Sequence, residues 1–272
     1  MGVKLVVSDL DGTLLNSEHM VSPRTRRAIE AVRQAGIKFT LASGRSYQSM
    51  RTWSDDLAID VPLISYQGAL ITDPSTRQPI YSKVFPMELV RDVCAFCQQR
   101  HLSLTLYAQD EIYVADKRQS DDFYEAWFGL PWHVVQGDLA ESLPCAPIKF
   151  IIIGSQSELD AVEPELEAEL GERMEILRSH AYFLEGLALG VNKGTALAWL
   201  AERLGVAQQE TMAIGDNGND IAMLEWAGCG VVMESAIPRV KEAANRETLS
   251  CDEDGVALVL EELLDGNSSA QI

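Results

Sequence analysis

The chain begins with a short apolar strand that leads directly into two carboxylates and a glycine turn. Leu5, Val6 and Val7 form the apolar run, and Asp9 and Asp11 follow it within the sequence Asp-Leu-Asp-Gly-Thr. An apolar run bounded by turn signals is typical of a buried strand in a parallel sheet. Ligands bind beyond the carboxyl ends of such strands. Because buried carboxylates persist only when they are paired or bound to metal, this arrangement favours a Mg²⁺ site over an ordinary acidic turn.

Strand and helix patterns alternate after this motif. Ser22-Pro23 predicts the start of a helix, and Gly36 predicts its end. The apolar run 37–42 then predicts a second strand, and 62–65 predicts a third. Strands that alternate with helices indicate a doubly wound α/β fold, in which a parallel sheet is built by right-handed crossovers.

The pattern changes between about residues 81 and 187. There the sequence predicts a mixture of strands and helices, with strands at 103–107, 112–114 and 149–153 and helices at 88–99 and 157–170. After Lys193 the strand-helix alternation resumes, with helices at 194–204 and 221–227 and strands at 211–214 and 230–233. We therefore predict a core of residues 1–82 and 188–272 that is interrupted by an inserted α+β domain of residues 83–187.

Charge and composition exclude some classes of partner. The chain has 272 residues and a net charge of −19, which argues against binding to nucleic acid or to anionic membranes. No apolar stretch approaches the length of a membrane span, and we expect no signal peptide because the residues before the first strand lack the pattern of one. The 5 cysteines are an odd number scattered along the chain, which suits reduced thiols. We expect a cytoplasmic protein.

One cysteine pair has the spacing of a zinc motif. Cys94 and Cys97 are followed by His101, but all three positions fall at helical spacing. We interpret them as one face of a helix, because small apolar cysteines are common there and the remaining zinc ligands are missing.

Four segments at the ends of predicted strands or at the start of a helix carry complementary chemistry. They supply carboxylates, a hydroxyl donor and a fixed positive charge, from Asp9, Asp11, Ser43, Lys193, Asp216 and Asp220. Phosphoryl transfer needs a nucleophile, a metal, donors to the phosphoryl oxygens and an acid for the leaving group. The sequence therefore predicts a phosphoryl-transfer site.

These segments resemble the four motifs of the haloacid dehalogenase (HAD) superfamily, and they occur in the same order. The motifs are Asp9–Thr13, Ala42–Arg45, Gly190–Gly194 and Gly215–Asp220 with Met223. Together with the insert, they look like the Cof-type branch, whose members are mostly sugar-phosphate phosphatases. The resemblance implies a Rossmann-like core, a cap domain of the C2B type and a phosphorylated small metabolite as substrate.

The resemblance also implies roles for the acidic residues. Asp9 would be the nucleophile that forms an aspartyl-phosphate, and Asp11 would be the general acid and base. Mg²⁺ would be held by Asp9, Asp216 and the backbone carbonyl of Asp11. Asp220 would orient Lys193 or a metal-bound water.

A further set of residues is implied in phosphate binding: Ser43, Gly44, Arg45, Lys193 and Asn219. For Arg45 two readings stay open, because it could reach the substrate or brace the acidic site. The chain departs from the family at Gln67-Gly68-Ala69, where relatives commonly have Asn-Gly-Ala.

Two alternatives to a phosphatase remain at this stage. One is a phosphomutase of the same superfamily, and the other is a catalytically silent binding or regulatory protein on the same scaffold. The intact acidic residues and Lys193 argue against the silent protein. The sequence does not identify the substrate or the oligomeric state.

Overall fold

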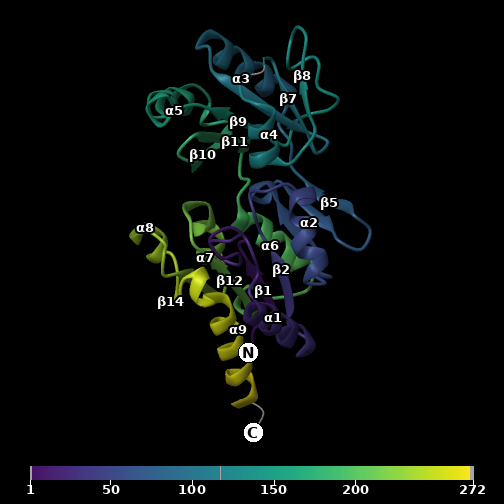
Figure 1. Cartoon of the computed structure of the whole chain (residues 1–272), viewed down its shortest axis with the longest axis vertical. Coiled ribbons are helices and arrows are strands. Elements are labelled where there is room, and N and C mark those ends of the chain that lie inside the picture. The colour runs from purple at the N-terminus through teal and green to yellow at the C-terminus, as the bar shows by residue number, and fades with distance from the viewer. Residues whose placement is uncertain (1, 117, 270–272) are drawn as a thin grey trace. The chain divides into compact units, whose positions relative to one another are not determined.

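A computed structural model describes residues 2–116 and 118–269 of the chain (Figure 1). Residues 1, 117 and 270–272, which belong to the predicted domain ranges, lie outside the described residues. The chain divides into two compact units, one formed by Met1–Ile80 and Asn192–Ile272 and the other by Tyr81–Val191. Each unit has a sheet and helices of its own, and each is described by itself.

The first unit contains a five-stranded parallel sheet in the order β14-β13-β12-β1-β2. The middle strands are almost entirely apolar and buried, as expected for a parallel sheet covered on both faces. The five strands are β1 (Leu5–Ser8), β2 (Lys38–Leu41), β12 (Thr211–Gly215), β13 (Cys229–Met233) and β14 (Arg246–Thr248). The predicted parallel α/β fold is confirmed.

Helices connect these strands. Ser22 caps α1 and Pro23 is its first residue, as the sequence predicts, and Ser46 and Asn192 cap α2 and α6. Helix α1 packs against α9, and α6 packs against α7. The helices are α1 (Pro23–Gln34), α2 (Tyr47–Asp56), α6 (Lys193–Arg203), α7 (Ile221–Trp226), α8 (Pro238–Lys241) and α9 (Gly255–Ser269).

The third predicted strand lies outside the five-stranded parallel sheet in which the sequence predicted it. Strand β3 (Leu63–Ser65) pairs antiparallel with β4 (Leu70–Asp73), and β5 (Gln78–Ser82) completes a separate three-stranded sheet. A single parallel bridge between Ala42 and Ile64 aligns β3 with the end of β2. The short connection from β3 to β4 allows a hairpin, and every residue of β3 is paired with a residue of β4.

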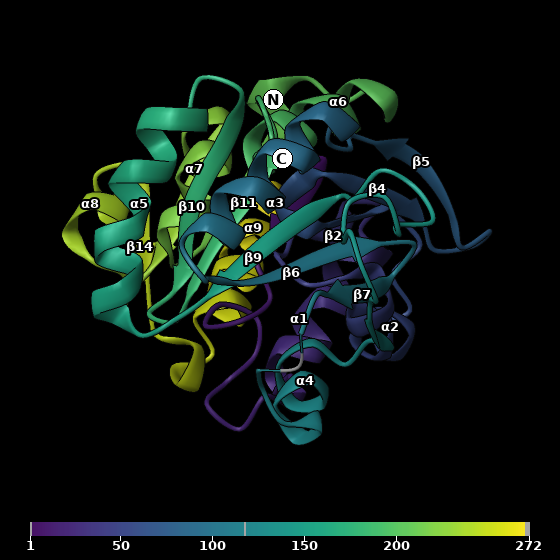
Figure 2. The ribbon, with the colours of Figure 1, turned by 90° about the horizontal axis from the view of Figure 1, so that it is seen from above.

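The second unit is an α+β domain, as the sequence predicts. Its six-stranded sheet has the order β10-β11-β9-β6-β7-β8, and β7 and β8 pair in parallel. Strands β10, β11, β9, β6 and β7 are labelled in Figure 2. Its strands are β6 (Ser103–Ala108), β7 (Glu111–Val114), β8 (Trp132–Val134), β9 (Lys149–Ile153), β10 (Met174–His180) and β11 (Phe183–Ala188). Its helices are α3 (Met87–Gln99), α4 (Asp121–Phe128) and α5 (Gln156–Leu170).

Helix α3 carries the cysteine pair. Cys97 is buried in the hydrophobic core of the second unit, and Cys94 packs against that core. Burial raises the pKa of the Cys94 thiol to about 12 and raises that of Cys97 as well. The interpretation as a helix face is confirmed for Cys94 and Cys97, whereas His101 lies beyond the end of α3 with a φ of 55°. All 5 cysteines of the chain are free.

Candidate active site

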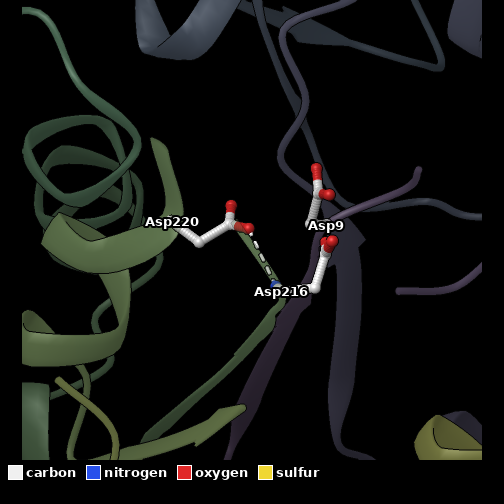
Figure 3. Close-up of side chains that lie close together, drawn as sticks. All are labelled: Asp9, Asp216 and Asp220. Carbon is white, nitrogen blue, oxygen red and sulfur yellow. Dashed lines mark hydrogen bonds between the residues drawn. The ribbon is translucent and has the colours of Figure 1, made fainter. Parts of the chain in front are cut away.

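Three acidic residues of the first unit, Asp9, Asp216 and Asp220, lie together at one edge of the parallel sheet. Asp9 directly follows β1 and Asp216 directly follows β12, and these two strands are neighbours in register. The backbone N–H of Asp9 donates to the carbonyl of Ile214 at 2.8 Å, which extends the strand pairing to Asp9. Because the strands are parallel, their carboxyl ends place both carboxylates at the same edge (Figure 3).

Lys193 lies at the centre of this group. It is the first residue of α6, its side chain is 0% exposed, and its Nζ lies 2.6 Å from both Asp9 Oδ1 and Asp220 Oδ1. Burial alone would lower the pKa of Lys193, but Asp220 and Asp9 more than offset it, so the pKa is raised. The site therefore holds a fixed positive charge between two carboxylates.

Both carboxylate oxygens of Asp220 accept hydrogen bonds from the protein. Its Oδ1 accepts from Lys193, and its Oδ2 accepts from the backbone N–H groups of Asp216 and Asn217, each at 3.0 Å. The dashed line in Figure 3 marks the bond from Asp216. These bonds fix the loop that follows β12 and position the lysine. Asp220 therefore acts as a support for Lys193 and Asp216.

Asp9, Asp216 and Asp220 form the one group of three metal-ligating side chains found among the described residues, with oxygens within 4.8 Å of one another. Burial raises the pKa of Asp9, and the nearby carboxylates of Asp220 and Asp216 add to this rise while Lys193 opposes it. Burial and Asp220 raise the pKa of Asp216 to about 6. A cation at this position would stabilise both ionised carboxylates.

The donor chemistry fits Mg²⁺. Asp9 and Asp216 offer carboxylate oxygens, which are the ligands that this hard cation prefers. Thr13 Oγ1 donates to Asp216 Oδ1 at 2.8 Å and orients that carboxylate. Since the oxygens of Asp220 are already engaged by Lys193 and two backbone groups, Asp9 and Asp216 are the better ligands of the three.

Arg45 and Asp11 form a bidentate ion pair. Arg45 Nε lies 2.7 Å from Asp11 Oδ2, and Nη2 lies 2.8 Å from Oδ1. The guanidinium also lies over the ring of Trp53, 5.1 Å from its centroid, and contacts Ser49 Oγ. The hydrogen bonds that Arg45 donates to the Asp11 carboxylate raise the pKa of Arg45. This contact is the one expected if Arg45 braces the acidic site, and contact with the substrate stays the second prediction for this residue.

The remaining phosphate-site candidates lie on two loops. Ser43 is 2% exposed, and its Oγ accepts the backbone N–H of Arg45 at 3.2 Å. Gly44 lies between them, in contact with the side chain of Gln67. Asn219 Nδ2 donates to Gln67 Oε1 at 3.0 Å. The phosphate-binding roles of these residues remain predictions.

Sequence reasoning assigned no role to some residues of the site. Thr13 lies inside the first motif, so its place there was a usable signal for its contact with Asp216. The sequence identified Gln67 as a departure from the family pattern, but it did not predict the contacts of Gln67 with Gly44 and Asn219. The support of Arg45 by Ser49 and Trp53 had no signal in the sequence, because it depends on how α2 packs.

Comparison with known proteins identifies the family. The sequence profile of the haloacid dehalogenase-like hydrolases matches residues 6–260. The chain belongs to this family. The predicted membership of the haloacid dehalogenase superfamily, and with it the prediction of a hydrolase, is confirmed.

Related proteins match over nearly their whole length. A Bacillus subtilis protein named "Putative phosphatase YxeH" is 33% identical over 266 residues, covering 96% of this chain and 98% of its own. A haloacid dehalogenase-like hydrolase structure from Bacteroides thetaiotaomicron is 33% identical with a TM-score of 0.85, covering 96% and 99%. A structure described as a HAD subclass IIB sugar phosphatase is 27% identical with a TM-score of 0.80, covering 96% and 98%.

The helices of the described residues were compared with the requirements of a membrane span only in length and apolar character, and the result concerns residues 2–116 and 118–269. None of their helices combines the length and the apolar character that crossing a bilayer requires.

Proposed function

We propose that this chain is a Mg²⁺-dependent phosphatase that hydrolyses small phosphate monoesters through an aspartyl-phosphate on Asp9. The observation that carries the proposal is the buried contact of Lys193 with Asp9 and Asp220, at the sheet edge where Asp216 also lies. A buried lysine between carboxylates suits a site where negative charge develops on a phosphoryl group. The names of the relatives support the same reaction class.

In this proposal Asp9, Asp216 and the backbone carbonyl of Asp11 would hold Mg²⁺. The bound ion would offset the negative charge of the phosphoryl group and of the carboxylates. Asp220 would support this arrangement through Lys193 and through the backbone of the loop after β12.

The protein's own residues would carry out two displacement steps. A carboxylate oxygen of Asp9 attacks phosphorus, the phosphorus–oxygen bond to the leaving alcohol breaks, and Asp11 donates a proton to that alcohol. Water then attacks phosphorus, Asp11 takes up a proton from the water, and the bond to Asp9 breaks. Lys193 stabilises the charge on the phosphoryl oxygens, and Arg45 orients Asp11.

We propose that phosphate binding uses Ser43, Gly44, Arg45, Lys193 and Asn219. Residues 1–82 and 188–272 would form the catalytic core, and residues 83–187 would form the C2B-type cap. A phosphorylated sugar is the proposed substrate, in line with the description of one solved relative. The free cysteines suit the reducing cytoplasm that we propose for this enzyme.

The test is a screen of the purified protein with Mg²⁺ against a panel of sugar phosphates, other phosphate monoesters and an aryl phosphate. Free phosphate should be released from at least one sugar phosphate, and Asp9→Asn should abolish this release while the circular dichroism spectrum stays unchanged. Transfer of the phosphoryl group to a second sugar, without free phosphate, would show a mutase. Turnover by Asp9→Asn at the wild-type rate would refute the proposal that Asp9 is the nucleophile.

A further inference from the structure

The turn after β3 has an unusual backbone for its residue types. Tyr66 has a φ of 49°, Gln67 a φ of 58°, and Gly68 a φ of 104°. Tyr66 and Gln67 are also buried, at 1% and 3% exposed. Non-glycine residues in this left-handed region are strained, and the strain persists only where the surrounding structure holds it. Such strain is concentrated at functional sites.

Backbone hydrogen bonds join this turn to the loop that follows β2. The N–H of Tyr66 donates to the carbonyl of Arg45 at 2.9 Å, and the N–H of Gln67 donates to the carbonyl of Ser43 at 3.0 Å. The left-handed conformation lets two successive N–H groups reach this one loop. The turn therefore fixes the backbone of two proposed phosphate-binding residues.

The same turn packs against the start of α6. A Cβ added to Gly68 would lie 2.4 Å from the carbonyl oxygen of Asn192, the residue before Lys193. No side chain larger than hydrogen fits between these backbones without a shift. The turn is thus in contact with the element that positions the buried lysine.

The side chain of Gln67 spans two further segments of the site. Its Nε2 lies 2.4 Å from the position of a Cβ added to Gly44, so the amide covers that glycine. Its Oε1 accepts from Asn219 Nδ2 at 3.0 Å. Asn219 Oδ1 is buried and has no hydrogen-bond partner among the described residues. The bond to Gln67 therefore sets the orientation of the Asn219 amide.

We propose that Gln67 is a positioning residue for phosphate binding, which aligns Asn219 and the Ser43–Arg45 loop with each other. This inference rests on the proposed phosphatase function. Asparagine at this position is one methylene shorter, so from the same backbone it would not reach both Gly44 and Asn219.

The experiment is a double-mutant cycle on Gln67→Met and Asn219→Ala, with Gln78→Met as the matched control. Methionine keeps the volume of the glutamine and removes both hydrogen-bonding groups, whereas Gln78 is exposed on β5. The readouts are KM and kcat for a phosphate monoester and, by calorimetry with Mg²⁺ present, the Kd of inorganic phosphate. Thermal unfolding checks the fold, and Gln67→Asn replaces Gln67→Met if the latter does not fold.

We expect Gln67→Met to raise KM and the phosphate Kd by about tenfold, the equivalent of one lost hydrogen bond, with a smaller change in kcat. In the double variant the loss of phosphate binding should be smaller than the two single losses combined, because part of the effect of Gln67 passes through Asn219. An unchanged Kd in Gln67→Met, or additive effects in the double variant, would overturn the inference. The control should match wild type.

A nuclear magnetic resonance measurement separates this inference from the proposed function. The side-chain NH₂ resonances of Asn219 should shift in Gln67→Met and should exchange faster with water. If wild type neither hydrolyses phosphate esters nor binds phosphate, the proposed function fails, and these resonances still test the positioning. Resonances that are identical in wild type and Gln67→Met would overturn the positioning role by themselves.

Discussion

Replacing Asp220 with asparagine tests the buried charges of the first unit most directly. The carboxylate is fully buried and accepts hydrogen bonds from Lys193 on one oxygen and from two backbone N–H groups on the other. Asparagine has nearly the same shape but only one acceptor oxygen. Whichever way its amide turns, the NH₂ group must face either the lysine ammonium or the two backbone donors.

The expected loss follows from what remains in the site. Removing one partner of a buried ion pair costs about 3–5 kcal/mol, because the other charge stays buried. Asp9 still lies 2.6 Å from Lys193, so we expect the lower end of this range, about 3 kcal/mol. For a domain of about 150–250 residues, each kcal/mol lowers Tm by about 2–4 °C, which predicts a decrease of about 6–12 °C.

Thermal unfolding followed by circular dichroism measures this decrease. Asp60→Asn is the matched control, because its carboxylate is 78% exposed and lies 3.6 Å from Arg33. A surface pair of this kind contributes at most about 1 kcal/mol, so the control should unfold close to wild type. If Asp220→Asn unfolds at the same temperature as the control, the reasoning about the buried pair is refuted.

Three further predictions follow from the same site and from the thiols. Asp11→Asn should lower kcat by about 10²- to 10⁴-fold on sugar phosphates and by much less on an aryl phosphate, whose leaving group needs no proton; equal losses would contradict its role as an acid. EDTA should abolish turnover, Mg²⁺ should restore it, and Ca²⁺ should inhibit because its larger coordination shell misaligns the reactants; full activity in excess EDTA would remove the metal from the mechanism. Burial raises the pKa of Cys94 to about 12, so iodoacetamide at pH 8 should modify the exposed Cys145 and spare Cys94, as peptide mass mapping would show. Because the unfolded thiol ionises at about pH 8.5, the stability from burying protonated Cys94 is complete below that pH and is lost as pH rises toward 12.

Local sequence patterns were enough to predict most elements of the fold. Ser22 and Pro23 mark the start of α1 because capping and a fixed proline φ act on neighbouring residues. The apolar runs that became β1 and β12 are buried on both faces, which requires a continuous apolar sequence. The partner of β3 was predicted less well, since pairing depends on a hairpin whose hydrogen bonds the apolar pattern does not encode.

The sequence also predicted which acidic residues lie close together. Asp9 and Asp216 each follow a buried strand, and parallel strands end at the same edge of a sheet, so their proximity follows from topology. The order of the four motifs along the chain was sufficient to identify the family, whose profile matches residues 6–260.

Only the tertiary structure decided which side chains bond to one another. Lys193 and Asp9 are 184 residues apart in the chain, and their 2.6 Å contact depends on where α6 packs against the sheet. In the same way, the pairing of Arg45 with Asp11 and the link from Gln67 to Asn219 join different loops. The sequence by itself determined local conformation and burial, because these depend on neighbouring residues. Side-chain hydrogen bonds require atoms placed to within a fraction of an ångström, and strand order and helix packing set those positions.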